Sequence, residues 1–378
     1  MSFAPLGLPQ SFLDILEKEN YKQPYPIQEQ AIPVILQGKD VLGIAKTGSG
    51  KTASYVLPVL AMLKSKKEVK DRQVDVLVLV PTRELAEQVK EVFSLFEKGL
   101  SHPVKTMAVY GGVSINPQMK SLYGVSVLVA TPGRLLDLVN SKAVHFNKLQ
   151  TLILDEADKL LNLGFREEMN QIFALLPQKR QNLLFSATLS EKVEEIHQIL
   201  LKNPVVVNVA PTSSTIDQIN QVAYAISEEK KGPLLRYLIT KGELKQVLVF
   251  ASSTYKADNI ADKLRKNGIK AEAIHSKKSQ NARKTSLEDF KAGKLTVLVA
   301  TDLLARGIDI EFLPHVINYE LPRSPKDYVH RIGRTGRAES SGEAITLVTP
   351  EEEHHFKVIQ KKMKCWVNRI DGNEIDLS

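Results

Sequence analysis

Short, continuous runs of apolar residues recur along the chain, and each run ends in small or polar residues. Segments with the apolar period of a helix, such as residues 83–96 and 167–176, lie between these runs. Continuous apolar strands that alternate with amphipathic helices are typical of parallel sheets covered by helices on both faces. The pattern therefore predicts an α/β fold. The predicted strands are Val41–Ala45, Val76–Val80, Val125–Ala130, Leu149–Leu154, Leu183–Phe185, Val247–Ala251, Val297–Ala300 and Val316–Tyr319.

One strand sequence occurs twice. The pentapeptide Val-Leu-Val-Ala-Thr at residues 127–131 is repeated letter for letter at residues 297–301. A shared Val-Leu-Val pattern links residues 76–82 with residues 247–253 at nearly the same spacing. Buried strands draw on few residue types, which accounts for one such match more easily than for two. We therefore predict two similar halves, whose ligands bind beyond the carboxyl ends of the strands.

Length and composition agree with globular halves. At about 100–200 residues per domain, 378 residues allow two or three domains. With 43% hydrophobic and 25% charged residues, the chain is neither disordered nor fibrous. Residues 209–219 break both periodicities and are rich in linker residues. We predict an amino-terminal domain at 1–208, a linker at 209–219, a carboxyl-terminal domain at 220–365 and a tail at 366–378.

Composition also bears on location and partners. The single cysteine, Cys365, cannot form an internal disulfide, and no Cys/His spacing suits zinc, which favours the reducing cytoplasm. The first residues lack a signal-peptide pattern, and no apolar stretch approaches the ~18–20 residues that span a bilayer, so we expect no membrane partner. The net charge of +8 allows a polyanionic partner without requiring one.

A phosphate-binding loop is predicted at residues 45–52, Ala-Lys-Thr-Gly-Ser-Gly-Lys-Thr, between a strand and a helix-like segment. Its glycines let backbone N–H groups surround phosphates at a helix N-terminus. Lys51 would reach the β- and γ-phosphates, and the Thr52 hydroxyl would hold Mg²⁺. Ala45 replaces the usual first glycine, and an ordinary glycine-rich turn is the alternative. The expected ATP contacts are Thr47, Gly48, Ser49, Gly50, Lys51 and Thr52.

An acidic tetrapeptide follows the predicted strand at residues 149–154. Asp155 would hold Mg²⁺, partly through water, because this ion keeps part of its hydration shell. Glu156 is placed to orient and deprotonate an attacking water. A helix N-terminus is the alternative, since acidic residues are favoured there in any case. Together with the phosphate loop, the tetrapeptide is a strong indication of a site for Mg²⁺ and phosphates.

With these motifs in hand, the sequence resembles the DEAD-box RNA helicases over nearly its whole length, and most closely their bacterial RhlE-like subgroup. The resemblance implies two RecA-like domains, each with a parallel sheet covered by helices on both faces. The matching segments, in the family's order, are residues 20–28, 81–85, 111–112, 131–134, 155–158, 186–188, 247–253, 280–283, 300–309 and 330–337.

The resemblance assigns nucleotide roles to further residues. Gln28 would read adenine, and Tyr21, seven residues earlier, would stack on the base. Asn20 and Tyr25 depart from the family's usual glycine and Thr/Ser there, and a core aromatic is the alternative for Tyr21. The second half has no phosphate loop, so one nucleotide must serve both halves. The remaining implied contacts are Asp309 to the ribose, and Arg334 and Arg337 to the γ-phosphate as arginine fingers.

The resemblance also implies RNA contacts at the carboxyl ends of strands. Hydroxyl, guanidinium and backbone N–H groups there suit phosphate oxygens rather than base edges. Helix N-capping is the alternative for Thr82 and Thr131. The implied RNA contacts are Pro81, Thr82, Arg83, Gly112, Thr131, Pro132, Gly133, Arg134 and Thr301. The residues that would couple hydrolysis to domain closure are Asp158, Ser186, Thr188 and His330.

We therefore predict an ATP-dependent RNA helicase with a monomeric core that uses ATP and Mg²⁺, binds RNA without sequence preference and unwinds short duplexes locally. An ATP-gated RNA clamp with little unwinding fits the same motifs and is the main alternative. A DNA helicase of the same superfamily is the second.

Overall fold

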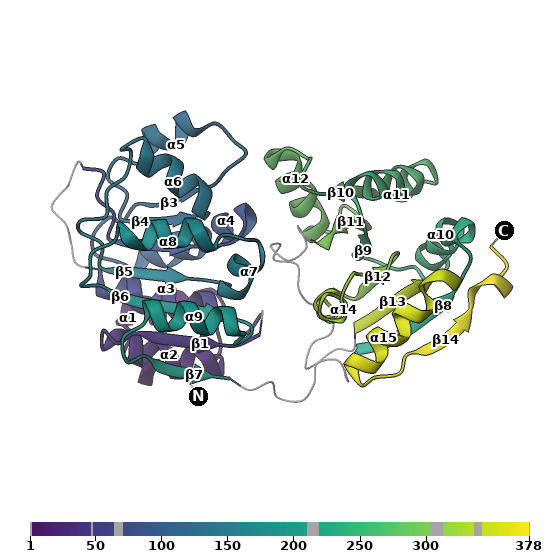
Figure 1. Cartoon of the computed structure of the whole chain (residues 1–378), viewed down its shortest axis with the longest axis horizontal. Helices are drawn as coiled ribbons and strands as arrows, with labels where there is room; N and C mark the ends of the chain where they lie inside the picture. Colours follow the sequence, from purple (N-terminus) through teal and green to yellow (C-terminus); the bar gives the residue numbers. More distant parts are fainter. Residues whose placement is uncertain are drawn as a thin grey trace. The chain divides into compact units, whose positions relative to one another are not determined.

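The computed structural model describes residues 2–46, 48–63, 71–209, 219–302, 313–335 and 342–377. The chain divides into two compact units, residues 1–211 and residues 212–378 (Figure 1). Within the described ranges, no helix is both long and apolar enough to cross a membrane.

The first unit is built on a parallel sheet of seven strands in the order β3-β4-β2-β5-β6-β1-β7. Its strands are β1 (Val41–Ile44), β2 (Val76–Leu79), β3 (Thr106–Val109), β4 (Val127–Ala130), β5 (Thr151–Leu154), β6 (Gln181–Ser186) and β7 (Val205–Asn208). Its α-helices are α1 (Gln10–Lys18), α2 (Pro26–Leu36), α3 (Lys51–Met62), α4 (Arg83–Phe96), α5 (Ile115–Ser121), α6 (Pro132–Asn140), α7 (Ala157–Asn162), α8 (Arg166–Ala174) and α9 (Glu191–Leu200), with short 3₁₀ helices at Ala4–Leu6 and Glu97–Gly99.

Helices cover both faces of this sheet, which explains why its strands read as continuous apolar runs. Along β2, Val76 and Val78 join the core beneath α1–α4, whereas Leu77 and Leu79 join the core beneath α6–α9. All four side chains are buried. Each such burial contributes about 1.5–3 kcal/mol, so every strand residue is constrained.

The second unit repeats this arrangement with the strand order β10-β11-β9-β12-β13-β8-β14, again wholly parallel. Its strands are β8 (Ile219–Ala225), β9 (Val247–Ala251), β10 (Ala271–Ile274), β11 (Val297–Thr301), β12 (His315–Asn318), β13 (Gly342–Val348) and β14 (Asn368–Asp371). Its α-helices are α10 (Lys231–Lys241), α11 (Thr254–Lys266), α12 (Gln280–Lys291), α14 (Pro325–Ile332) and α15 (Glu353–Met363), with 3₁₀ helices at Glu228–Lys230, Pro350–Glu352 and Gly372–Glu374.

The repeated strand sequences occupy equivalent places in the two sheets. In the first sheet Val127 of β4 is paired with Val76 of β2, and in the second Val297 of β11 is paired with Val247 of β9. The predicted α/β fold with two similar halves is therefore confirmed. Residues 368–371, which lie in the predicted tail, form the edge strand β14 beside β8.

Candidate functional site

The strand order brings the phosphate loop and the acidic tetrapeptide together. The loop follows β1 and the tetrapeptide follows β5, and only β6 lies between these two strands. Because the strands are parallel, all three carboxyl ends meet at one edge of the sheet. Figure 1 labels the three strands in the first unit. This edge of the first unit is a candidate nucleotide site.

The two residues expected to contact adenine, Tyr21 and Gln28, precede β1 and the phosphate loop in the sequence. Gln28 is buried, and its Oε1 accepts a hydrogen bond from the backbone N–H of Tyr25 at 2.9 Å. Its Nε2 donates to the carbonyl of Gly50 at 3.1 Å and so ties the segment before α2 to the phosphate loop. A carboxamide offers two lone pairs and two N–H groups, so one of each remains for a ligand. Asn20 has a φ of +60°, a left-handed conformation that asparagine tolerates in place of the usual glycine.

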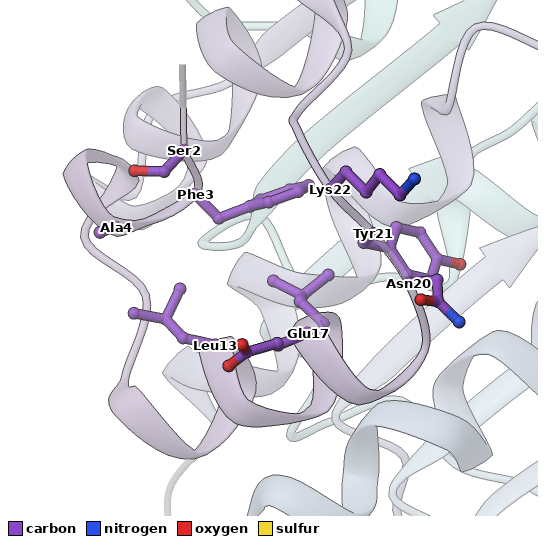
Figure 2. A pocket seen from close by; sticks show the side chains of 9 residues that line it. Ser2, Phe3, Ala4, Leu13, Glu17, Asn20, Tyr21 and Lys22 are labelled. Atoms are coloured by element: carbon purple, nitrogen blue, oxygen red, sulfur yellow. The ribbon is translucent and has the colours of Figure 1, made fainter.

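The rings of Tyr21 and Phe96 form an edge-to-face pair, with centroids 5.8 Å apart. Figure 2 shows Tyr21 and Asn20 on one side of a pocket of about 480 Å³ and Leu13 and Glu17 on another. The remaining lining residues are Ser2, Phe3, Ala4, Leu16 and Lys22. Tyr21 thus makes a core contact with Phe96, while the residue as a whole stays partly exposed.

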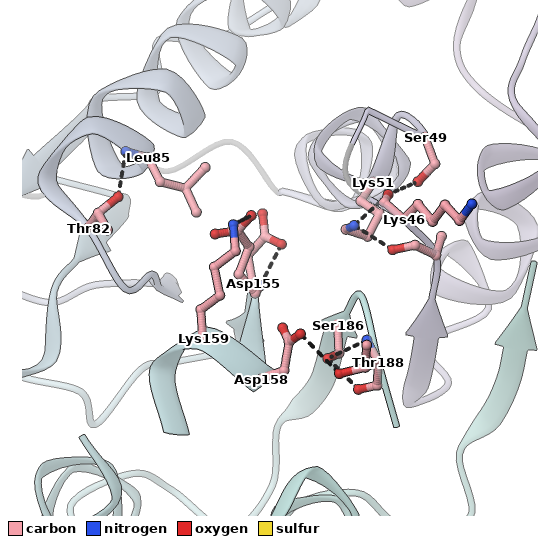
Figure 3. A network of polar contacts seen from close by, with 12 residues as sticks. Lys46, Ser49, Lys51, Thr82, Leu85, Asp155, Asp158, Lys159, Ser186 and Thr188 are labelled. Carbon is pink, nitrogen blue, oxygen red and sulfur yellow. Dashed lines mark hydrogen bonds and ion pairs between the residues drawn. The ribbon is translucent and has the colours of Figure 1, made fainter. Parts of the chain in front are cut away.

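Lys51 is the buried cation of the site. Helix α3 begins at this residue, directly after Gly50, whose φ of +81° suits glycine. The Lys51 ammonium donates to the carbonyl of Ala45 at 2.6 Å. It also donates to the carbonyl of Lys46 at 2.7 Å (Figure 3). Burial lowers the pKa of Lys51, although the nearby carboxylates of Asp155 and Glu156 oppose this shift. The loop therefore holds a positive charge at its centre. Thr47 lies outside the described residues.

Asp155 is buried and uses both carboxylate oxygens. Its Oδ1 accepts the backbone N–H of Glu156 at 2.8 Å, and its Oδ2 accepts the hydroxyl of Tyr55 at 2.8 Å. Burial raises the pKa of Asp155, while the charge of Lys51 and the hydrogen bond from Tyr55 act in the opposite direction. The carboxylate is thus fixed in one orientation.

Glu156 adopts a left-handed backbone conformation, with φ +52° and ψ +48°. Such a conformation is costly for a residue other than glycine and is often found at functional sites. Its Oε1 accepts from the Lys159 ammonium at 2.5 Å, but its Oε2 is buried with no hydrogen-bond partner in the described part of the chain. Burial raises the pKa of Glu156, and the charge of Lys159 partly offsets this. One carboxylate oxygen is therefore available for a ligand.

Three of the four residues expected to couple the two halves lie together. The Thr188 hydroxyl donates to Asp158 Oδ2 at 3.1 Å, and the Ser186 hydroxyl donates to the Thr188 carbonyl at 2.8 Å (Figure 3). Asp158 Oδ1 is buried without a partner among the residues that the structure describes. The fourth, His330, lies on α14 in the second unit.

The residues expected to contact RNA in the first unit follow the adjacent strands β2, β3 and β4. Thr82 caps α4, because its Oγ1 accepts the backbone N–H of Leu85 at 3.3 Å. Thr131 stands at the N-cap of α6 but makes no side-chain capping bond. Capping therefore explains Thr82 and does not explain Thr131. Pro81 follows β2, and Pro132 and Gly133 form the first turn of α6.

Two arginines, Arg83 and Arg134, lie against the loop that follows β3. Arg134 Nη2 donates to the Val113 carbonyl at 2.9 Å, and its Nη1 is buried without a hydrogen-bond partner in the described ranges. Gly112 has a φ of +74°, and a Cβ placed on it would lie 2.0 Å from the Arg83 guanidinium. The structure thus brings Arg83, Gly112 and Arg134 together around one loop.

Gly112→Ala should disturb this loop. Forcing an alanine into the left-handed region costs about 1–2 kcal/mol, and the added Cβ must displace Arg83. We expect lower thermal stability and weaker binding of single-stranded RNA, measured by fluorescence anisotropy. Gly111→Ala is the matched control, because a Cβ there meets no atom within 4 Å. Equal RNA affinity of the two variants would contradict this role of Gly112.

In the second unit, Arg331 was not singled out from the sequence. Its Nε and Nη2 bond the two carboxylate oxygens of Asp302 at 2.5 and 2.8 Å. Its Nη1 donates to Asn318 Oδ1 at 3.1 Å and to the Glu320 carbonyl at 2.6 Å. Arg331 thereby joins the end of β11, where Thr301 lies, to α14. The signal was present, since Arg331 lies in the 330–337 match and Asp302 follows Thr301 directly.

The other expected residues of this unit are only partly described. Arg334 is buried, and its backbone N–H bonds the Arg331 carbonyl at 3.1 Å just after α14. Asp309 and Arg337 lie outside the described residues. The fold and the site together define a P-loop ATPase with two RecA-like domains.

Comparison with known families and relatives agrees with this class. The DEAD/DEAH box helicase model matches residues 25–196, and the helicase conserved C-terminal domain model matches residues 229–339. The DEAD-box ATP-dependent RNA helicase CshA of Streptococcus pneumoniae is 42% identical over 96% of this chain and 68% of its own length. RhpA of Helicobacter pylori, of the same description, is 39% identical over 96% of this chain and 72% of its own length. The chain belongs to the DEAD-box ATP-dependent RNA helicases.

Solved structures show the same fold. Saccharomyces cerevisiae Dbp5 bound to RNA and ADP BeF3 matches with a TM-score of 0.85 and 28% identity, over 98% of this chain and 95% of Dbp5. A DEAD box protein of Methanococcus jannaschii matches with a TM-score of 0.56 and 32% identity, over 98% of this chain and 99% of its own. The predicted family and tandem RecA-like fold are confirmed. The RhlE-like subgroup stays a prediction, since the two bacterial relatives named above are CshA and RhpA.

Proposed function

We propose that this chain is an ATP-dependent RNA helicase that couples ATP binding and hydrolysis to RNA binding without sequence preference and to local unwinding of short duplexes. Family membership supports the activity, and the observation that carries it here is the meeting of Lys51, Asp155 and Glu156 at one sheet edge. The cytoplasm, where ATP and RNA are both available, is the proposed location, and the proposed core is monomeric.

The chain binds ATP, and the phosphates would lie on the loop that surrounds Lys51. Asp155 and the Thr52 hydroxyl would hold Mg²⁺, in part through water. Carboxylate and hydroxyl oxygens suit this hard cation, and the buried oxygen atoms Glu156 Oε2 and Asp158 Oδ1 lie in the same acidic turn without a hydrogen-bond partner in the described ranges. When bound, Mg²⁺ would neutralise part of the negative charge on the phosphates. Gln28 and Tyr21 would contact adenine, and Asp309 the ribose.

Hydrolysis would use Glu156 as the general base. Its free Oε2 takes a proton from the water that attacks the γ-phosphorus, and the bond to the ADP oxygen breaks. Burial raises the pKa of Glu156 toward the working pH, which favours proton transfer. Arg334 and Arg337 would stabilise the charge on the transferred phosphoryl group.

RNA would bind through its sugar-phosphate backbone. Arg83 and Arg134 supply guanidinium groups around the Gly112 loop, and Pro81, Thr82, Thr131, Pro132 and Gly133 lie at the same edge. Thr301 is the counterpart of Thr131 in the second sheet. The bonded set Asp158, Ser186 and Thr188, with His330 of the second unit, would link hydrolysis to domain closure.

The experiment is an ATPase assay with RNA, with DNA of the same sequence and with neither, across a salt series. We expect stimulation by RNA but not by DNA, because only RNA offers the 2′-hydroxyl. Stimulation should fall steeply with salt, since phosphate contacts release counterions. Strand displacement on a short RNA duplex then separates a helicase from an RNA clamp. Stimulation without displacement would support the clamp, and equal stimulation by DNA would contradict RNA specificity.

A further inference from the structure

Tyr55 contacts the site without belonging to either sequence motif. It lies on α3, one turn after Thr52, and its side chain is fully buried at 0% exposure. Its hydroxyl donates to Asp155 Oδ2 at 2.8 Å, across 100 residues of sequence. The Thr52 hydroxyl also hydrogen-bonds the same phenol. One hydroxyl thus contacts both side chains that we assign to Mg²⁺.

The ring of Tyr55 is held by other aromatic side chains. Its centroid lies 5.2 Å from that of Phe185 on β6 and 6.5 Å from that of Phe93 on α4. Phe185 in turn occupies the space beside Gly43, where a Cβ would come within 2.5 Å of its ring. Packing therefore fixes the phenol, and the phenol offers its proton to Asp155 from a constant position.

The hydroxyl is not needed for this packing. A phenylalanine would fill the same space between Phe93 and Phe185, and burying a hydroxyl is unfavourable unless it is hydrogen-bonded. The hydroxyl is therefore explained by what it contacts rather than by the core.

We propose that Tyr55 is a positioning residue, whose hydroxyl fixes the Asp155 carboxylate and the Thr52 hydroxyl in the geometry that binds Mg²⁺ with the nucleotide. This inference rests on the metal site of the proposed function. With Oδ1 held by the Glu156 N–H and Oδ2 by Tyr55, the carboxylate plane cannot rotate, and the remaining lone pairs keep one direction. Groups that orient metal ligands in this way typically change metal affinity by about 10–100-fold when removed.

Tyr55→Phe tests the inference, because it removes one oxygen and leaves the ring. Binding of a fluorescent ADP analogue is measured in EDTA and across a Mg²⁺ titration, and binding of Mn²⁺ to the protein–ADP complex is measured by electron paramagnetic resonance. We expect unchanged affinity in EDTA, a half-saturating Mg²⁺ concentration about 10-fold higher, and Mn²⁺ binding weakened to a similar degree.

Tyr328→Phe is the matched control. Tyr328 is also fully buried, and its hydroxyl bonds Thr346 Oγ1 at 2.9 Å in the second unit. This variant loses the same group, and its Mg²⁺ dependence should equal that of the wild type. Unchanged Mg²⁺ and Mn²⁺ binding in Tyr55→Phe, or an equal change in Tyr328→Phe, would overturn the positioning role of Tyr55. Either result would leave the proposed metal site intact. If the nucleotide affinity of the wild type does not depend on Mg²⁺ concentration, the proposed metal site is wrong, and the inference about Tyr55 falls with it.

Discussion

Replacing Glu156 by glutamine should abolish ATP turnover while ATP and RNA still bind. Glutamine keeps the length of the side chain and one oxygen that can accept from Lys159, so the turn at the left-handed Glu156 should survive. It cannot take a proton from water, and loss of a general base lowers rates by about 10²–10⁴-fold. Steady-state ATPase assays with saturating RNA measure the loss, and fluorescent-nucleotide and RNA titrations measure the retained binding.

Glu167→Gln provides the control for this prediction. Glu167 is an exposed residue in the first turn of α8, and the substitution makes the same chemical change away from the site. It should hydrolyse ATP at the wild-type rate. Normal turnover by Glu156→Gln would refute its assignment as the base, and lost nucleotide binding would indicate a structural role instead.

Arg334→Lys should lower RNA-stimulated hydrolysis by about 10³-fold or more, the range attributed to arginine fingers. Lysine keeps the positive charge but lacks the planar pair of donors that matches two phosphate oxygens. The affinity for ATP should change little, because the phosphate loop of the first unit, with Gly50 and Lys51, would supply the main contacts to the phosphates. Single-turnover hydrolysis separates chemistry from product release, and thermal denaturation checks that the buried side chain tolerates the exchange.

Arg369→Lys is the matched control for Arg334. Arg369 pairs with Glu353 near the surface of the second unit, where an ion pair contributes at most about 1 kcal/mol. Its hydrolysis rate should equal that of the wild type. If Arg334→Lys also hydrolyses ATP at the wild-type rate, its assignment as an arginine finger is contradicted. Either a positive charge alone then suffices at this position, or Arg334 does not contact the transferred phosphoryl group.

Much of this site could be predicted from the motifs and their order along the chain. Lys51 and Thr52 are recognised because a phosphate loop needs particular residues at fixed, local spacing. The fold class followed from strands buried on both faces, such as Val76–Leu79, which leave a continuous apolar signature. Local conformational needs were also readable in part, as Thr82 at the N-cap of α4 shows.

Other contacts left no local pattern. The Gln28 side chain bonds the backbone carbonyl of Gly50, and Arg331 pairs with the side chain of Asp302. In both cases the partners are distant in sequence, and the residues next to Gln28 or Arg331 do not indicate which partner it meets. Capping also failed for Thr131, although Thr82 has the same place before its helix. In each case the three-dimensional surroundings decide which of several possible partners is met.

By itself, the sequence determined that the protein has two α/β halves and carries the residues of an ATP-dependent RNA helicase, because helical period, strand burial and phosphate-loop chemistry are short-range properties. Only the tertiary structure decided that β6 separates the two ATP motifs and that the Tyr55 hydroxyl bonds Asp155. The physical reason is that strand order and side-chain partners arise from packing between distant segments, and tyrosine in an apolar helix reads as a core residue until its hydroxyl is seen to touch a carboxylate.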